Sequence, residues 1–363
     1  MAPKAPNRSA LLDSLGDLLP GLALLVALAL VARGLAAFVP VPALLLAVLV
    51  GGLLANTVGV PDRFESGVGT YNFWLEVGIV LMGVRVSLDA LVEAGPTLLV
   101  TVVGVVGFTL VVAELLARGF DLQRRLGSLV AAGASVCGVS AVVAVAGAIR
   151  ADEEHVAYAT STILVFDALT LFTYPAVGHA LGLADRVFGV WAGLTMFSTG
   201  PVTAAGFAYS EVAGQWATVA KLTRNVLLGG LVVAYSVVYA GSGSGDESAV
   251  GSGSDDESAV GSPSGDGSAS AVSFLRSLWD GFPTFVLGFL ALVVLASAGV
   301  FTDPQLARIE EAYRAAFLVA FAGLGTSVAL GDLRETGVRP LAVLALTLAV
   351  VSAVVLVVVR VVF

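Results

Sequence analysis

The chain has 363 residues, of which 58% are hydrophobic and only 12% are charged, against roughly 25% charged residues in a typical soluble domain. Its mean hydropathy is +0.97 and its formal net charge is −9. This composition excludes a soluble enzyme, because so much apolar surface needs lipid as its solvent, and no basic stripe for binding nucleic acid is present.

Residues that bind metals or hydrolyse nucleotides are scarce. Cys137 is the single cysteine, and the two histidines, His155 and His179, are far apart in the sequence. Motifs of the types HExxH, CxxC and GxxxxGK[ST] do not occur. We therefore expect no metal site, no cofactor and no ATP-driven pump within this chain.

Long apolar runs predict an all-α polytopic membrane protein, because a spanning helix needs about 20 mostly apolar residues. Barrel strands would alternate in hydropathy over about ten residues, and these runs are continuous. About eleven transmembrane helices are predicted, at 18–38, 41–60, 72–88, 97–117, 127–149, 156–182, 187–208, 215–240, 281–300, 312–330 and 340–362. Residues 1–17 precede the first helix, 18–240 contain helices 1 to 8, and 277–363 contain helices 9 to 11 of the same membrane domain.

Basic residues predict the orientation of the chain. With the N-terminus inside, ten Lys and Arg residues fall in cytoplasmic segments and three fall outside. The segment "RGFDLQRR" from Arg118 to Arg125 contributes most to this difference. We expect a multi-pass protein of the cell membrane, with lipid as its surroundings and a homodimer as one option for its assembly.

The segment 241–276 contains a near-duplicated unit of Gly, Ser and acids that cannot bury enough apolar area to fold. Six acids and no Lys or Arg lie within 241–270, so the rest of the chain carries only −3 of the formal −9. The pattern predicts a flexible, acidic cytoplasmic linker, with a partner-binding tail as the alternative.

Two parts of the chain resemble each other. Residues 41–117 and 283–360 each contain three predicted helices, and similar segments align Gly83 with Gly325. The two copies would insert with opposite orientation, which is the inverted-repeat plan of many secondary transporters. Chance similarity between Gly- and Val-rich helices is the alternative.

Small and polar residues interrupt two predicted helices, in "GASVCGVSA" (133–141) and "FSTGPVTAAG" (197–206). Such breaks free backbone groups at membrane depth, where transporters use them to bind ions or anionic groups. Alternatively, these residues only allow close helix packing. The candidate substrate-binding residues in the breaks are Ser135, Cys137, Gly138, Ser140, Ser198, Thr199, Gly200 and Thr203.

Several charged residues fall within predicted spans, where charge usually marks a substrate or ion pathway, and four of them are candidates for function. Lys221 and Arg224 share one helical face, which predicts anion recognition, with snorkelling to the membrane surface as the alternative. Asp167 is the deepest carboxylate, and Glu76 lies in another span. We expect Asp167 and Glu76 to carry a coupling ion or proton, unless Asp167 is permanently paired, with Arg224 for example.

The segments "GASVCGVSA", "RADEEHVAYA", "YPAVGHALGL" and "ATVAKLTRN" resemble the YeiH-like family of proposed sulfate exporters. This resemblance implies an inner-membrane transporter for sulfate or a sulfonate-type anion, with an antiporter-like fold of crossed, broken helices. Family members read closer to "HDTAQVVAAG" where this chain has "FSTGPVTAAG". A titratable His-Asp pair is thus replaced by Phe197 and Ser198, and Asp167 stands where the family has a small residue.

These observations predict a secondary transporter of a small anion that works by alternating access, coupled to protons or sodium. One alternative is a cation/proton antiporter in which Asp167 and Glu76 bind the cation and Lys221 is structural. The other is a membrane enzyme or sensor without transport, for which "RADEEH" (150–155) is the one cluster of suitable residues.

Overall fold

The computed structural model describes residues 8–86, 88–240, 284–327 and 338–363. The predicted linker at 241–276 lies outside the described residues, as do residues 1–7. Every regular element in the described ranges is a helix, which confirms the predicted all-α class.

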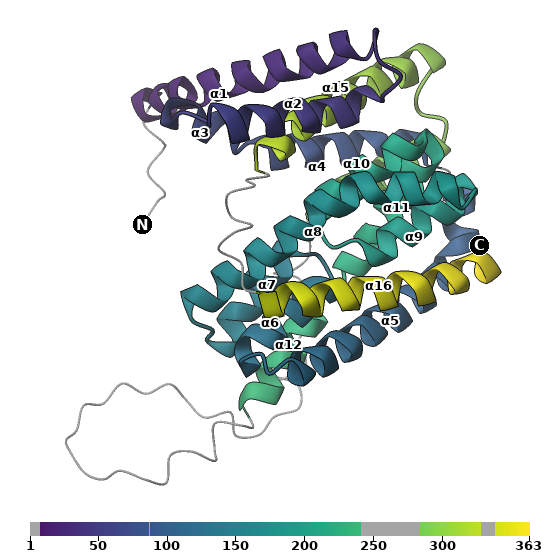
Figure 1. Cartoon of the computed structure of the whole chain (residues 1–363). Coiled ribbons are helices and arrows are strands. Elements are labelled where there is room, and N and C mark those ends of the chain that lie inside the picture. The colour runs from purple at the N-terminus through teal and green to yellow at the C-terminus, as the bar shows by residue number, and fades with distance from the viewer. Residues whose placement is uncertain (1–7, 87, 241–283, 328–337) are drawn as a thin grey trace, which may run out of the picture.

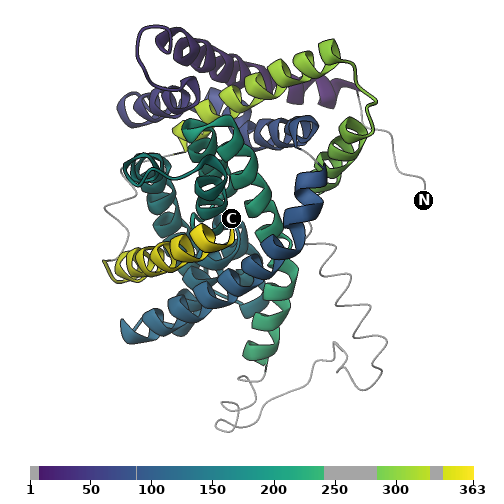
Figure 2. The same ribbon diagram turned by 90° about the vertical axis from the view of Figure 1, so that its right-hand side faces the viewer.

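The helices form two bundles (Figures 1 and 2). We call the one made from the N-terminal helices together with α14 and α15 the flanking bundle. It contains α1 (Arg8–Leu35), α2 (Ala43–Thr57), α3 (Asp62–Val68), α4 (Tyr71–Met82), the short 3₁₀ helix η1 (Gly83–Arg85), α14 (Phe285–Ser297) and α15 (Asp303–Thr326).

The second bundle, which we call the hairpin bundle, contains most of the middle of the chain and the C-terminal helix. Its members are α5 (Leu88–Gly119), α6 (Arg124–Ser135), α7 (Val139–Ile149), α8 (Glu153–Ala180), α9 (Asp185–Thr195), α10 (Thr199–Tyr209), α11 (Glu211–Asn225), α12 (Leu228–Ala240) and α16 (Val338–Val362).

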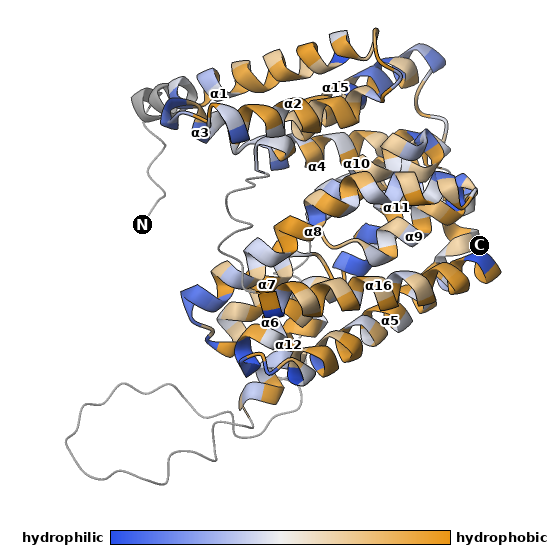
Figure 3. Ribbon diagram, in the orientation of Figure 1, coloured by the Kyte–Doolittle hydropathy of each residue, from blue (hydrophilic) through white to orange (hydrophobic). Residues whose placement is uncertain are grey.

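Within the described residues, six helical stretches are long and apolar enough to cross a membrane. They are Gly16–Leu35, Asp62–Arg85, Ala94–Gly119, Glu153–Ala180, Glu211–Ala240 and Val338–Val362. Apolar residues cover most of the length of the helices, and polar residues gather toward their ends (Figure 3). The fold is therefore that of a multi-pass membrane protein, and the predicted total of about eleven spans is not confirmed.

The predicted span at 187–208 is two helices, α9 and α10, and the contacts of both with α11 define their directions. A side chain added at Gly189 would meet Ala213, and one added at Gly193 would meet Ala217. Residue numbers rise together along this contact, so α9 runs parallel to α11.

Helix α10 runs the other way along α11. Thr218 Oγ1 donates to Thr203 Oγ1 at 3.2 Å, and Asn225 Nδ2 donates to Thr199 Oγ1 at 3.1 Å. One residue number rises as the other falls, so α10 is antiparallel to α11 and hence to α9. The chain reverses between them, and 187–208 is a re-entrant helical hairpin instead of one crossing helix.

The predicted span at 127–149 is likewise a hairpin, made of α6 and α7. Arg125, at the start of α6, lies 3.9 Å from Asp152, just after α7 ends. Gln123 contacts His155 in the same place. The outer ends of the two arms are therefore neighbours, which a single helix broken in its middle could not achieve.

The two hairpins enter from opposite sides of the bundle, because α8 connects their bases and has 28 residues, or about 42 Å of helix. Each arm has 11 or 12 residues, about 17 Å, which is roughly half of the 30 Å hydrocarbon thickness. The tips of the two hairpins therefore meet near mid-membrane depth.

Glycines allow backbones in the flanking bundle to touch. A Cβ at Gly21 would lie 2.5 Å from the Cα of Gly67, and one at Gly51 would lie 3.2 Å from the Cα of Gly325. Small residues in such places favour helix association in lipid. The two similar segments of the sequence fold here as α2 to α5 and α14 to α16, and their inverted orientation stays a prediction.

Candidate functional site

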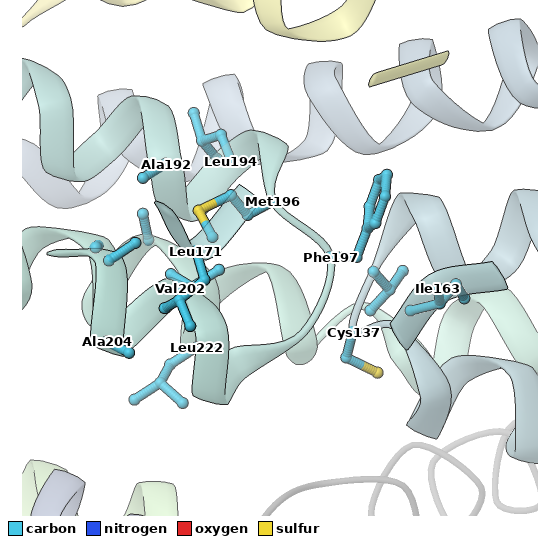
Figure 4. Close-up of a cluster of buried hydrophobic side chains, with 14 of the residues drawn as sticks. Cys137, Ile163, Leu171, Ala192, Leu194, Met196, Phe197, Val202, Ala204 and Leu222 are labelled. Carbon is cyan, nitrogen blue, oxygen red and sulfur yellow. The ribbon is translucent and has the colours of Figure 1, made fainter. Parts of the chain in front are cut away.

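The hairpin tips touch each other through Gly138 and Ser198. Gly138 has φ +69° and ψ −129°, a conformation that side-chain-bearing residues rarely adopt. A Cβ there would lie 2.1 Å from Ser198 Oγ. Only glycine fits at this contact. Figure 4 shows Cys137 at the turn of the first hairpin and Met196 and Phe197 on the extended turn of the second.

Arg224 of α11 binds the end of the first arm in both hairpins. Its Nε donates to Ser135 O at 2.5 Å and its Nη2 to Ala134 O. Its Nη1 donates to Leu194 O at 2.9 Å and to Met196 O at 3.0 Å. The last carbonyls of a helix have no partner within it and carry its negative end, so one guanidinium caps α6 and α9 together.

Lys221 lies one turn earlier on α11 and binds the turns themselves. Its Nζ donates to Val136 O at 2.8 Å, to Met196 O at 3.0 Å and to Phe197 O. These bonds use all three protons of the ammonium group. Lys221 and Arg224 therefore hold the two tips together, and both cations donate their hydrogen bonds to backbone carbonyls.

This geometry changes the interpretation of the two cations. Lys221 and Arg224 are each 0% exposed, so snorkelling to the membrane surface is wrong. Neither side chain lines the neighbouring cavity. Both contact helix ends at the two breaks, where we had expected a bound anion.

A cavity of about 780 Å³ lies between the two bundles, beside the tips. The flanking bundle contributes α4 and the ends of α14 and α15, and the hairpin bundle contributes α7, α8, α10, α11 and α12. Its polar lining residues are Tyr71, Asn72, Glu76, Cys137, Ser140, Asp167, Ser198, Thr199, Asn225, Thr284 and Ser327.

The second arm of each hairpin starts at this cavity. Val139 and Ser140 are the first two residues of α7 and line it, as do Thr199 and Gly200 at the start of α10. The first N–H groups of a helix have no acceptor within it, and they carry its positive end. Two positive helix ends therefore converge on one cavity.

Asp167 reaches the tip of the second hairpin from α8. Its Oδ1 accepts the Ser198 N–H at 3.0 Å, and the side chain is 3% exposed. Lys221 is near enough to act on it electrostatically. Asp167 therefore pairs with the α10 N-terminus, and Arg224 bonds to carbonyls instead of to this carboxylate.

Most of the remaining predicted residues line the cavity, and three do not. Gly138 lies at the contact with Ser198. Ser135 is buried with its hydroxyl on Ala131 O, and Thr203 accepts a hydrogen bond from Thr218. Glu76 lines the cavity from the flanking bundle. The sequence reasoning missed Asn225, although it is the last residue of the "KLTRN" segment in which we singled out the two cations.

Polar contacts join the two bundles near the middle of α15, ten residues before Leu324 of the cavity lining. Arg314 Nη2 lies 3.4 Å from Glu211 Oε2 at the start of α11, and Tyr313 donates to the same carboxylate. Within the flanking bundle, Glu310 binds Arg85 at 2.5 Å and Arg314 at 2.6 Å.

Comparison with known proteins places the chain in a family. It is 33% identical to a UPF0324 membrane protein of Nitratidesulfovibrio vulgaris, over 88% of this chain and 87% of that protein. A UPF0324 membrane protein of Bartonella henselae is 30% identical over 82% of this chain and 77% of its own. No solved structure matches. Residues 20–344 match the family described as Conserved hypothetical protein 698, and the chain therefore belongs to that family of membrane proteins.

Proposed function

We propose that the protein is a secondary active transporter of a small anion, of the sulfate or sulfonate type, which binds at the tips of the two hairpins. One observation carries this proposal. The N-termini of α7 and α10 open into the cavity, while Arg224 and Lys221 neutralise the C-termini of α6 and α9 beside them. Helix N-termini bind anions through free N–H groups and the helix dipole.

The charge balance at the tips favours one additional negative charge. Each helix end carries about half an elementary charge. The two negative ends offset one of the two cations, and Asp167 offsets the other. The two positive ends remain, a surplus of about one positive charge at the tips, while Glu76 lines the cavity from the flanking bundle. A bound anion would complete this balance.

Alternating access needs two bodies and a contact that can open. The cavity lies between the flanking and hairpin bundles, and the Arg314–Glu211 ion pair joins them beyond it. Movement of one bundle against the other would break this pair and expose the tips to the opposite side.

A cation/proton antiporter is the second candidate. The charged side chains of the described cavity lining are two carboxylates, Asp167 and Glu76, and Lys221 has the structural role that this alternative assigns to it. Uptake of radioactive sodium against a pH gradient would favour the antiporter, and uptake of radioactive sulfate would favour the anion carrier.

The decisive experiment is sulfate uptake into proteoliposomes by Ser140→Asp. Position 140 is in the first turn of α7, at the cavity. A carboxylate there stabilises the helix by about 0.3–1 kcal/mol. It would repel an anion about 8 Å away by about 2 kcal/mol at an effective dielectric constant near 20, which weakens binding about 30-fold.

Ser140→Asn is the matched control, because it has the same shape without the charge. We expect Ser140→Asn to transport sulfate within a few-fold of wild type and Ser140→Asp to lose uptake while unfolding no earlier. Equal sulfate uptake by both variants would rule out the anion site at these helix ends.

A further inference from the structure

Three buried oxygen atoms at the tip of the second hairpin have no hydrogen-bond partner. Six buried side-chain nitrogen or oxygen atoms lack one in the part of the chain that the structure describes. Half of these atoms, Asp167 Oδ2, Ser198 Oγ and Asn225 Oδ1, belong to residues that line the cavity. Buried polar atoms are nearly always satisfied, so the three together indicate a missing ligand.

Hydrogen bonds hold the three residues around the start of α10. Asp167 Oδ1 accepts the Ser198 N–H, and the Ser198 hydroxyl is near enough to donate to the same carboxylate, which leaves the lone pairs of Ser198 Oγ and Asn225 Oδ1 without a donor. Thr199 follows Ser198 and accepts from Asn225 Nδ2 at 3.1 Å. Asp167 and Asn225 are 3% and 6% exposed, so the bonded half of each side chain is fixed and its other oxygen is buried.

The chemistry of the free atoms is that of a cation site. A carboxylate oxygen, a hydroxyl oxygen and an amide oxygen are hard ligands, which suit cations that prefer oxygen. A proton could satisfy Asp167, but an amide oxygen such as Asn225 Oδ1 needs a separate donor. The helix-end carbonyls already accept hydrogen bonds from Lys221 and Arg224. A bound cation would therefore depend on the side-chain oxygens of Asp167, Ser198 and Asn225.

We infer that Asp167, Ser198 and Asn225 form a binding site for one small monovalent cation, with Na⁺ as the expected ion. The role of this site in coupling transport rests on the proposed anion function. A bound cation raises the positive surplus at the tips from about one charge to about two. A divalent anion then balances the site, so the cation and the dianion bind cooperatively.

Sodium-dependent stability of the purified full chain tests the cation site without any transported anion. Unfolding is measured in detergent while NaCl replaces choline chloride at constant chloride concentration. A ligand that binds only the folded state stabilises it in proportion to ln(1 + [Na⁺]/Kd), so the titration yields a Kd. We expect saturable stabilisation by NaCl over choline chloride.

Asn225 variants identify the site. Asn225→Leu should weaken sodium binding by about tenfold or more and Asn225→Asp should strengthen it, because the number and charge of oxygen ligands set the affinity. Thr223→Val is the control, since its hydroxyl on the same helix bonds to Val219 O instead. It should bind sodium like wild type.

Equal stabilisation by NaCl and by choline chloride would overturn the inference. Stabilisation by NaCl that is unchanged in Asn225→Leu would overturn it as well. If Asn225→Leu does not fold, Asn225→Asp decides, and an unchanged sodium affinity in that variant also overturns it. Sulfate uptake in sodium-free medium is measured separately. Uptake without any sodium effect would leave the anion proposal standing and remove the cation site.

Discussion

Replacing Arg224 by Met tests the claim that this side chain is a structural cap. Met keeps most of the side-chain volume but removes four hydrogen bonds, to Ala134, Ser135, Leu194 and Met196. A bond to a charged donor contributes about 1.5–3 kcal/mol, and removing one buried charged partner costs about 3–5 kcal/mol after relaxation. We expect a loss of about 4 kcal/mol in the free energy of unfolding.

Tryptophan fluorescence during unfolding in mixed detergent micelles measures this loss. Arg224→Lys should recover about half of it, because the ammonium keeps the charge but cannot reach both hairpins. Arg360→Gln is the control, since Arg360 is exposed and donates to Leu181 O at 3.2 Å, so that variant should lose less than about 1 kcal/mol. An Arg224→Met protein as stable as wild type, but unable to bind sulfate, would show that Arg224 is an anion ligand and refute the capping argument.

Two further predictions concern the tips and the contact between bundles. Gly138→Ala should destabilise the protein by about 2 kcal/mol or more, because its Cβ would clash with Ser198 at a positive φ, whereas Gly147→Ala, with nothing within 4 Å, should be tolerated in the same unfolding assay. Cys137 lines the cavity, so an impermeant maleimide should label it from one membrane face in wild type. Arg314→Gln removes the ion pairs with Glu310 and Glu211, of which the exposed pair with Glu211 joins the bundles and contributes up to about 1 kcal/mol, and it should raise labelling from the other face up to about fivefold. Unchanged labelling would contradict a gate at that contact.

Hydropathy predicted that the chain is helical and membrane-embedded, but it could not distinguish a hairpin from a crossing helix. Residues 187–208 are apolar almost throughout, and the direction that the chain takes after a break leaves no trace in a hydropathy average. Short arms of 11 or 12 residues have the combined length of one span. The small-residue segments around Gly138 and Ser198 located both turns, because only such residues allow two backbones to meet.

The site was predictable where side-chain chemistry defines it and unpredictable where backbone atoms do. Asp167, Ser140 and Thr199 were identified as polar residues at membrane depth, and they line the cavity. The partners of Lys221 and Arg224 could not be predicted, because every residue has a carbonyl and only the fold determines which carbonyls bind a cation. A charged residue in a membrane segment therefore indicates that it has polar partners. It does not indicate whether those partners belong to a ligand or to the protein.

The paired hairpins also affect how the chain is threaded through the bilayer. A hairpin leaves through the face by which it entered, so each one removes a crossing, and two together leave the sidedness of every later segment unchanged. Only the segment between them is reversed, which exchanges Arg150 and Arg186 between the two faces. The count of ten basic residues against three therefore gives the same orientation with or without the hairpins, and loop charge alone could never have revealed them. Labelling of single cysteines introduced at positions 150 and 186 would distinguish the two threadings.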